Sequence, residues 1–388
     1  MTGCIIGWAH SKFGKREGVS VEEMIVEVGA DALAHAALEP KDVDAIYVGQ
    51  FNGGFVPQEF PSSLVLQLDP GLRFTPATRV ENACATGSAA IHQGLNAIAA
   101  GRARRVLVVG VEKMTEVSGK AVGDVLIKAA YLAEEGGIEG GFVGVFGRIA
   151  QAYFQRHGDQ SDALARIAAK NHRNGAGNPL AHLQQDLGFT FCREESEKNP
   201  YVAGPLKRTD CSLVSDGAAA LVLSDVDTAL TSSQVVVFRA AEQVNDYFPM
   251  SKRDIVAFEG CREAWTRALV ASGLSLDDLD LVETHDCFTI AELLEYEAMG
   301  LAAPGQGARL TEEGVTERDG RLPVNPSGGL KSKGHPIGAT GVSMHALACM
   351  QLAGSAGDIQ IDGAAKAGVF NMGGAAVANY VSILERLR

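Results

Sequence analysis

Two stretches of the chain repeat one pattern: residues 32–49 read "ALAHAALEPKDVDAIYVG" and residues 268–285 read "ALVASGLSLDDLDLVETH". In each stretch an apolar helical pattern ends at a leucine, and an Asp-x-Asp step leads into a short run of strand-forming residues. The two stretches therefore predict that one helix–strand unit occurs twice in the chain.

Two further pairs of segments follow in the same order. "CATGSAA" from Cys84 matches "GATGVSM" from Gly338, and each opens an apolar helical pattern. "DGAAALVLSD" from Asp216 matches "GGAAVANYVS" from Gly373. A single match between Ala/Gly-rich segments can arise by chance, but three matches in one order indicate two related halves. Strand patterns alternate with helical ones, which predicts an α/β fold with a parallel or mixed sheet.

The first half of the repeat is interrupted by a long segment in which the pattern is absent. We expect an N-terminal half formed by residues 1–111 and 208–230, and a C-terminal half formed by residues 231–388. Residues 112–207 between them are expected to form an inserted loop domain. Apolar residues at helical intervals predict one long helix in this insertion, over residues 147–171.

The overall composition restricts the class of partner. The chain has 388 residues, enough for two domains or one large α/β body with an insertion, and a net charge of −13. This charge argues against nucleic acid or an anionic membrane surface as the main partner. No apolar run approaches the roughly 20 residues of a membrane span. Seven cysteines without C-x-x-C spacing favour a reducing, cytoplasmic setting and argue against a zinc site.

Cys84 lies where a strand pattern ends and a helical pattern begins, within "ENACATGSAA" from Glu81. The start of a helix carries unpaired N–H groups and the positive end of the helix dipole, which favour a thiolate. A thiolate is the form that attacks a thioester carbon, and the small neighbouring residues leave room for an acyl group. The alternative is an ordinary buried cysteine, the usual fate of an unpaired one.

His285 and Cys287 lie in "THDCFTIAELLEYEAMG", which starts at Thr284 and follows a strand pattern. Thr289 and Glu292 have the spacing of a capping box, which predicts that a helix begins there. The histidine and the cysteine then lie on a tight strand-to-helix turn, where α/β proteins bind ligands. A surface histidine beside a core cysteine is the alternative.

A glycine-rich stretch near the C-terminus, "NPSGGLKSKGHPIGATG" at residues 325–341, places five glycines around His335. Glycine lets the backbone approach a ligand closely, and so glycine-rich a segment is poor material for a core. An ordinary flexible loop is the alternative. Further on, "FNMGGAA" from Phe370 reads as a strand and a glycine turn, whose N–H groups around Gly373 suit an oxyanion. A simple β-turn explains that segment equally well.

These motifs resemble those of thiolases, and within them the sterol-carrier-protein-2-type and archaeal-type branch. The resemblance covers nearly the whole chain. Its most specific motifs are "HDCF" at residues 285–288 and "GHPIGATG" at residues 334–341, with "CATGS" from Cys84 in support. The resemblance implies a thiolase-like duplicated five-layered αβαβα fold with an inserted loop domain. It also implies an acetyl-CoA C-acyltransferase, which makes or thiolytically cleaves 3-ketoacyl-CoA in a reversible Claisen reaction.

The resemblance further implies a role for each site residue. Cys84 would carry the acyl group as a thioester, and His335 would activate it. His335 and His285 would stabilise the enolate oxygen of the second acyl-CoA, whose α-proton Cys287 would remove. The N–H groups of Cys84 and Gly373 would form the oxyanion hole of the tetrahedral intermediate. Breaking a C–H bond beside a thioester requires such a base next to an oxyanion site.

One position departs from the pattern of many thiolases. Those enzymes carry their acid/base cysteine in a C-terminal Cys-x-Gly motif, whereas this chain has Asn371, Met372 and Gly373 there. In the branch with the HDCF motif the thiol comes from Cys287 instead, so a pair of catalytic thiols is retained.

Three other functions are open at this stage. A decarboxylating β-ketoacyl synthase uses a Cys-His-His set on this fold, but it needs no base, so Cys287 favours the thiolase. A steroid-type acyl-CoA C–C lyase is the second; such relatives tend to have lost the thiols. The third is a non-catalytic acyl-binding subunit, since archaeal-type relatives can work with a small OB-fold, zinc-containing protein. Retention of both thiols and both histidines argues against a catalytically inactive subunit.

The resemblance also determines which ligands and partners we expect. Coenzyme A and acyl-CoA are substrates, and neither a permanently bound cofactor nor a metal is implied. Basic groups of the insertion are expected to hold the CoA phosphates, but the sequence singles out no residue for this. The family implies a homodimer, with a tetramer as the alternative.

Overall fold

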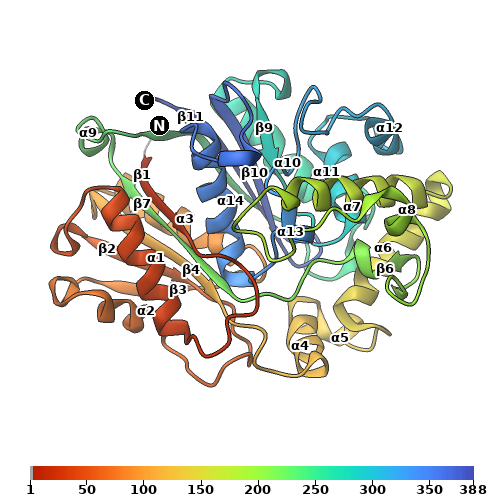
Figure 1. The fold of residues 1–388 in the computed structure, drawn as a ribbon, viewed down its shortest axis with the longest axis horizontal. Helices are drawn as coiled ribbons and strands as arrows, with labels where there is room; N and C mark the ends of the chain where they lie inside the picture. Colours follow the sequence, from red (N-terminus) through yellow and green to blue (C-terminus); the bar gives the residue numbers. More distant parts are fainter. Residues whose placement is uncertain (1–2) are drawn as a thin grey trace.

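The computed structural model describes residues 3–388, and one nine-stranded sheet runs through the molecule (Figure 1). Its strands lie in the order β3-β2-β4-β7-β1-β8-β11-β10-β9. Their bounds are β1 Cys4–His10, β2 Ala45–Gly49, β3 Ala77–Val80, β4 Arg105–Glu112, β7 Gly217–Ser224, β8 Val236–Asn245, β9 Leu281–Glu283, β10 Lys366–Gly373 and β11 Ala378–Arg386. A separate two-stranded hairpin contains β5 Tyr201–Ala203 and β6 Leu206–Lys207.

The helices alternate with the strands, as the sequence predicts for an α/β fold. Those longer than one turn are α1 Val21–His35, α3 Thr86–Ala99, α4 Gly119–Leu126, α6 Gly141–His157, α7 Ser161–Ala176, α8 Gly188–Arg193, α10 Glu259–Ser272, α11 Thr289–Ala298, α12 Gly307–Glu312 and α14 Ile337–Leu352. Short helices are α2 Pro61–Leu64, α5 Leu132–Glu135, α9 Val226–Ala229 and α13 Gly329–Ser332. Within residues 3–388 no helix has the length and apolarity needed to cross a membrane.

The two halves of the sheet repeat one topology, which confirms the duplication. In the first half β2 pairs in parallel with β4, which pairs antiparallel with β7, which pairs antiparallel with β1. In the second half the same relations join β9 to β10, β10 to β11 and β11 to β8. The segments matched in the sequence occupy equivalent places in the two halves. These pairs are α1–β2 with α10–β9, the start of α3 with that of α14, and β7 with β11. The halves meet where β1 pairs antiparallel with β8.

The core divides into layers that match the expected five-layered arrangement. One buried cluster lies between α1 and the first half-sheet, for example Met24 and Val28 against Leu107 and Val222. A second joins α3 and α14 to strands of both half-sheets, so these two helices form the middle layer. A third covers the outer face of the second half-sheet with α10 and α11 and extends to α6 and α7. Figure 1 shows α14 in the middle of the molecule, between the two groups of strands.

The two helices of the middle layer approach each other closely at their N-terminal ends. A Cβ atom added to Gly87 of α3 would lie 2.7 Å from Val342 N and 2.8 Å from Gly341 N of α14. No side chain larger than hydrogen fits at that separation. The crossing therefore requires glycine, and it brings the starts of both helices, each preceded by a site motif, to one place.

The interrupting segment contains α4 to α8 and the β5–β6 hairpin, and two details differ from the sequence analysis. The single helix expected over residues 147–171 is two helices, α6 and α7, because Gly158 takes a positive φ of 84° and ends α6. β4 continues through Glu112, so the first residue assigned to the insertion belongs to the central sheet.

Replacing Gly87 with alanine tests the close helix crossing. The added methyl group would force α3 and α14 apart, and overpacking of this kind costs about 1–3 kcal/mol of unfolding free energy. Urea unfolding followed by circular dichroism measures the loss. The matched control is Gly123→Ala in α4, where nothing lies within 4 Å of the added Cβ. Because alanine favours helix, that variant should be unchanged or more stable by up to about 1 kcal/mol. Equal stability of Gly87→Ala and wild type would contradict the requirement for glycine.

Candidate active site

Cys84 lies in a tight turn between β3 and α3. Ala83 has a left-handed φ of 49°, and a 3.1 Å hydrogen bond from Ala85 N to Asn82 O closes the turn. The helix begins at Thr86, two residues later than the sequence predicts. The turn therefore carries Cys84, whose side chain is buried at the N-terminal end of the helix.

The structure brings Cys84 together with both predicted histidines. Cys84 Sγ and a ring nitrogen from each of His285 and His335 all lie within 4.8 Å of one another. The two imidazole rings are 5.1 Å apart between centroids and nearly perpendicular, at 81°. Cysteine and histidine are also zinc ligands, and in the described part of the chain this is the one such cluster of Cys, His or carboxylate groups. The expected absence of a resident metal therefore stays a prediction.

The hydrogen bonds of His335 determine which of its ring nitrogens carries the proton. Thr340 Oγ1 donates its one proton to Pro336 O at 2.9 Å. Its contact with His335 Nδ1, at 2.6 Å, must then be accepted by the hydroxyl oxygen, so Nδ1 carries hydrogen. The other ring nitrogen, Nε2, is left with a lone pair and can accept a proton from Cys84.

Asn371 determines the opposite tautomer of His285. The Asn371 amide nitrogen lies 3.1 Å from the backbone oxygen of Cys84, which can only accept, so the NH2 group faces this way. The same NH2 group lies 2.9 Å from His285 Nδ1, which must therefore accept. Nε2 of His285 then carries hydrogen, and it is buried without a hydrogen-bond partner among residues 3–388. It is a free donor, which suits an oxygen that develops negative charge.

Cys287 shares a cavity with Cys84. The cavity has a volume of about 110 Å³, and its walls, which include His335, are almost entirely apolar. Both sulfurs line it, together with Met114, Leu126, Phe142, Val143, Cys211, Ser212, Leu213, Val214 and Phe288. The two predicted thiols, one from each half of the chain, therefore flank one small apolar space.

Burial keeps the resting site uncharged. Desolvation raises the pKa of the Cys84 thiol to about 12, although a hydrogen bond from the Gly374 backbone opposes the shift. Desolvation also raises the pKa of Cys287, and it lowers the pKa of His335 to about 3. The helix N-terminus predicted a thiolate at Cys84, but burial has the larger effect. The thiolate forms only as the proton moves to a base.

The glycine turn after β10 lies against Cys84, as the sequence predicts for an oxyanion site. A Cβ on Gly373 would lie 2.5 Å from Asn82 O and 3.4 Å from Ala85 Cβ, on either side of the cysteine. The backbone amide that lowers the pKa of the Cys84 thiol belongs to the next residue, Gly374. Gly373 and Gly374 are thus both neighbours of the nucleophile.

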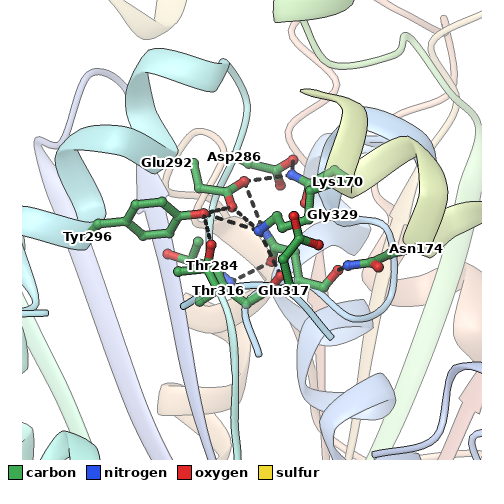
Figure 2. Close-up of polar contacts among 12 residues, drawn as sticks. Lys170, Asn174, Thr284, Asp286, Glu292, Tyr296, Thr316, Glu317 and Gly329 are labelled. Atoms are coloured by element: carbon green, nitrogen blue, oxygen red, sulfur yellow. Dashed lines mark hydrogen bonds and ion pairs between the residues drawn. The ribbon is translucent and has the colours of Figure 1, made fainter. Parts of the chain in front are cut away.

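The capping box expected at the start of α11 is absent, and both of its residues have distant partners. Thr289 is the first residue of the helix, and Phe288 takes the N-cap position that the sequence assigned to Thr289. The Thr289 hydroxyl donates to Asp210 Oδ1 at 2.7 Å, and Glu292 pairs with Lys170. Figure 2 shows the buried polar cluster around Glu292. Gly300, two residues after the end of α11, takes a positive φ of 91°.

Two family models match the chain. Thiolase, N-terminal domain, matches residues 4–227, and Thiolase, C-terminal domain-like, matches residues 241–386. The chain belongs to the thiolase family.

Individual relatives of this thiolase agree with that placement. Acetyl-CoA acetyltransferase of Methanothermobacter thermautotrophicus is 37% identical over 385 residues, which cover 98% of this chain and 99% of the relative. Sterol carrier protein 2 of Homo sapiens is 33% identical over 387 residues, which cover 95% of this chain and 69% of the relative. The expected enzyme class, an acyltransferase of the thiolase type, is confirmed.

Solved structures share the fold of this thiolase at lower identity. An "Ltp2-ChsH2(DUF35) aldolase" has a TM-score of 0.84 and 22% identity, covering 100% of this chain and 98% of that one. Human mitochondrial 3-ketoacyl-CoA thiolase in complex with CoA has a TM-score of 0.73 and 17% identity, with the same two coverages. The duplicated fold expected from the sequence is therefore confirmed.

The thiolase has a further buried residue at the site, Glu112, which the sequence analysis did not single out. Its carboxylate accepts hydrogen bonds of 2.9–3.0 Å from the backbone N–H groups of Phe51, Asn52 and Gly338. Gly338 lies in the first turn of α14, so Glu112 joins the first half of the chain to the helix that follows His335. Desolvation outweighs these bonds and raises the pKa of Glu112 to about 7. The sequence does contain a signal for this residue, because Glu112 is the one charged residue in the apolar stretch "VLVVGVE".

Replacing Glu112 with glutamine tests this raised pKa through stability. In wild type the unfolded chain loses its proton near pH 4.5 and the folded chain near pH 7, so rising pH costs stability between those values. Glutamine does not titrate. The unfolding free energy of Glu112→Gln minus that of wild type should therefore increase by about 2–3 kcal/mol between about pH 5 and pH 8.

Urea unfolding at both pH values measures this difference. The matched control is Glu195→Gln, which makes the same change of side chain at an exposed position. A pH-independent difference for Glu112→Gln would contradict the raised pKa.

Proposed function

We propose that this thiolase is an acetyl-CoA C-acetyltransferase. It condenses two acyl-CoA molecules, or cleaves 3-ketoacyl-CoA with CoA, through an acyl group on Cys84. The observation that supports this most directly is the pair of thiols, Cys84 and Cys287, flanking one apolar cavity beside two histidines of opposite tautomer. The full-length likeness to an acetyl-CoA acetyltransferase supports acetyl as the acyl group.

In the first half-reaction Cys84 takes the acyl group from acyl-CoA. Its proton moves to the lone pair on His335 Nε2 while Sγ attacks the thioester carbon, and N–H groups at the Cys84 and Gly373–Gly374 turns support the oxyanion. The C–S bond to CoA then breaks. A thiolate is a good enough leaving group to depart as an anion without an acid, so this step does not depend on Cys287. The departed CoA thiolate then takes a proton from Cys287. The products are acyl-Cys84, CoA, a Cys287 thiolate and protonated His335.

The second half-reaction uses the charges that the first one produced. The Cys287 thiolate removes the α-proton of the second acyl-CoA, and the enolate oxygen accepts hydrogen bonds from His285 Nε2 and protonated His335 Nε2. The enolate carbon attacks the acyl carbonyl, the C–S bond to Cys84 breaks, and Cys84 recovers its proton from His335. Every proton is returned, so the site ends neutral as it began.

The same observations weigh against the other functions. A decarboxylating synthase and a lyase have no use for a base thiol at the position of Cys287, and a passive acyl-binding subunit has no use for tautomers set by Asn371 and Thr340. The structural likeness to the Ltp2-ChsH2(DUF35) aldolase supports one further proposal, that a small OB-fold, zinc-containing partner protein assists this enzyme. We propose a cytoplasmic location from the free thiols.

We also propose that the enzyme is a homodimer, joined at β3. This strand is at the edge of the sheet, with its outer backbone groups unpaired by any other described strand. Phe60 and Phe74 nearby are 68% and 84% exposed, and an open hollow of about 860 Å³ lies beside Arg79 and Asn82 and reaches Gly373. A second copy of the chain would pair with the free edge of β3 and would cover the exposed side chains of Phe60 and Phe74.

Intact-mass analysis after incubation with acetyl-CoA tests the nucleophile and the base separately. Wild type should gain the mass of an acetyl group, and Cys84→Ala should not. Cys287→Ala should still become acetylated, yet its rate of acetoacetyl-CoA thiolysis should fall by about 100-fold or more, because the C–C step has lost its acid/base group. Cys349→Ala, a buried thiol in the middle of α14, is the control and should keep both activities. Wild-type thiolysis by Cys287→Ala would exclude Cys287 as the base.

A further inference from the structure

The turn that carries His285 and Cys287 is held at the residue between them. Asp286 is buried, and its carboxylate accepts a 2.6 Å hydrogen bond from Leu330 N and a 3.3 Å bond from Lys331 N. A third bond, of 2.9 Å, comes from the side-chain amide of Asn171. The two backbone donors belong to α13, in the segment leading to His335. Asp286 is thus one of the residues that hold the turn, together with Cys287 itself, whose backbone oxygen accepts a 2.9 Å bond from Ser212 N.

Asn171 reaches this turn from the inserted segment, where it lies on α7. Its amide nitrogen donates to Asp286 Oδ2 and also, at 2.6 Å, to Glu292 Oε2 in the first turn of α11. One amide group therefore connects the residue before Cys287 to the helix after it. Asn171 is fully buried, so removing its amide takes away bonds to Asp286 and Glu292 that the fold itself supplies.

Lys170, the neighbour of Asn171, supplies the charge that balances Glu292. Its ammonium group lies 2.5 Å from Glu292 Oε1, 2.8 Å from Val324 O and 3.1 Å from the Tyr296 hydroxyl. Figure 2 shows Lys170 and Tyr296 converging on the Glu292 carboxylate, with Asp286 beside it. Both charges are buried, and a buried carboxylate without its cation is strongly disfavoured. The ion pair holds Glu292 in place as the acceptor for Asn171.

The other catalytic residues are oriented by groups outside the insertion. His335 is held by Thr340, and Cys84 and His285 are both held by Asn371. Gly338, at the start of the helix after His335, is held by Glu112 of β4. The residues that attack the thioester and activate the nucleophile, Cys84 and His335, thus depend on the two repeated halves, while the turn carrying Cys287 is also held by α7.

We propose that Asn171 and Lys170 are positioning residues for Cys287, acting through Asp286 and Glu292, so that the inserted segment controls the carbon–carbon step and not the acylation of Cys84. This inference rests on the proposed function. It assigns to the insertion a part in the chemistry, in addition to any contacts that it makes with CoA. Loss of Asn171 removes the bond from α7 to Asp286 and the link to Glu292, so the turn is held less firmly. A displacement of about 1 Å at a reacting group costs up to about 100-fold in rate.

The experiment compares two reactions of the Asn171→Ala enzyme. Exchange of isotopically labelled CoA into acetyl-CoA measures acylation of Cys84 and its reversal. Thiolysis of acetoacetyl-CoA by CoA requires the carbon–carbon step as well. The kcat of thiolysis should fall by about 10- to 100-fold, with KM for acetoacetyl-CoA and the exchange rate each within about twofold of wild type. Lys170→Met should likewise lower the rate of thiolysis and leave the exchange rate near that of wild type. Lys170→Arg, which keeps the positive charge, should retain more thiolysis than Lys170→Met.

Asn178→Ala is the matched control, because Asn178 also lies in the inserted segment and its buried amide also donates one bond to the second half, to Ser327 O at 2.8 Å. It contacts neither Asp286 nor Glu292. Its loss should lower thermal stability to a similar extent and leave the ratio of thiolysis to exchange unchanged.

The outcomes separate this inference from the proposed function. If wild type shows no labelled-CoA exchange and no acyl-Cys84, the proposed function itself is wrong. If wild type does both, but Asn171→Ala lowers exchange and thiolysis equally, or lowers neither, then Asn171 has no selective role in the carbon–carbon step. A selective loss of thiolysis in Asn178→Ala as well would likewise exclude a specific role for Asn171.

Discussion

The active site depends on the contact between two helices at which no side chain can be accommodated. Gly87 and Gly341 let the starts of α3 and α14 approach almost backbone to backbone, in the middle layer of the molecule. The Cys84 turn precedes one helix and His335 precedes the other, so this approach sets their separation. Glu112 then fixes the second helix start from the opposite half by accepting its backbone N–H. The duplication places the starts of α3 and α14 at equivalent positions, and the glycines at the crossing allow these two helix starts to lie in contact.

Burial determines how the chemistry at this point can proceed. The thiols and imidazoles are neutral at rest because the apolar surroundings penalise charge. Two hydrogen bonds nevertheless make the histidines different: Thr340 leaves His335 ready to accept a proton, and Asn371 leaves His285 ready to donate one. The site thus stores its asymmetry in tautomers and not in charges, and charge appears only while a substrate is reacting.

Sequence reasoning identified the parts of the structure that short motifs encode. The three repeated segments predicted the duplicated sheet, and the motifs around Cys84, Cys287 and His335 predicted residues that the structure brings together. Local signals failed where distant partners decide the outcome. Thr289 and Glu292 have capping-box spacing, but each side chain has a partner far away in the chain. Thr289 donates a hydrogen bond to Asp210, and Glu292 forms an ion pair with Lys170. A thiolate at Cys84 followed from the helix start alone, and only the packed fold reveals how strongly desolvation opposes it.

The apolar walls of the cavity have a consequence for the acyl group that we propose on Cys84. Water can hydrolyse a thioester, and this loss competes with transfer of the acyl group to a second substrate. The space next to the sulfur measures about 110 Å³ and offers almost no polar atoms to hold a water molecule. In the proposed mechanism the cavity therefore disfavours water as the acceptor of the acyl group and favours a carbon or sulfur nucleophile that fills the apolar space.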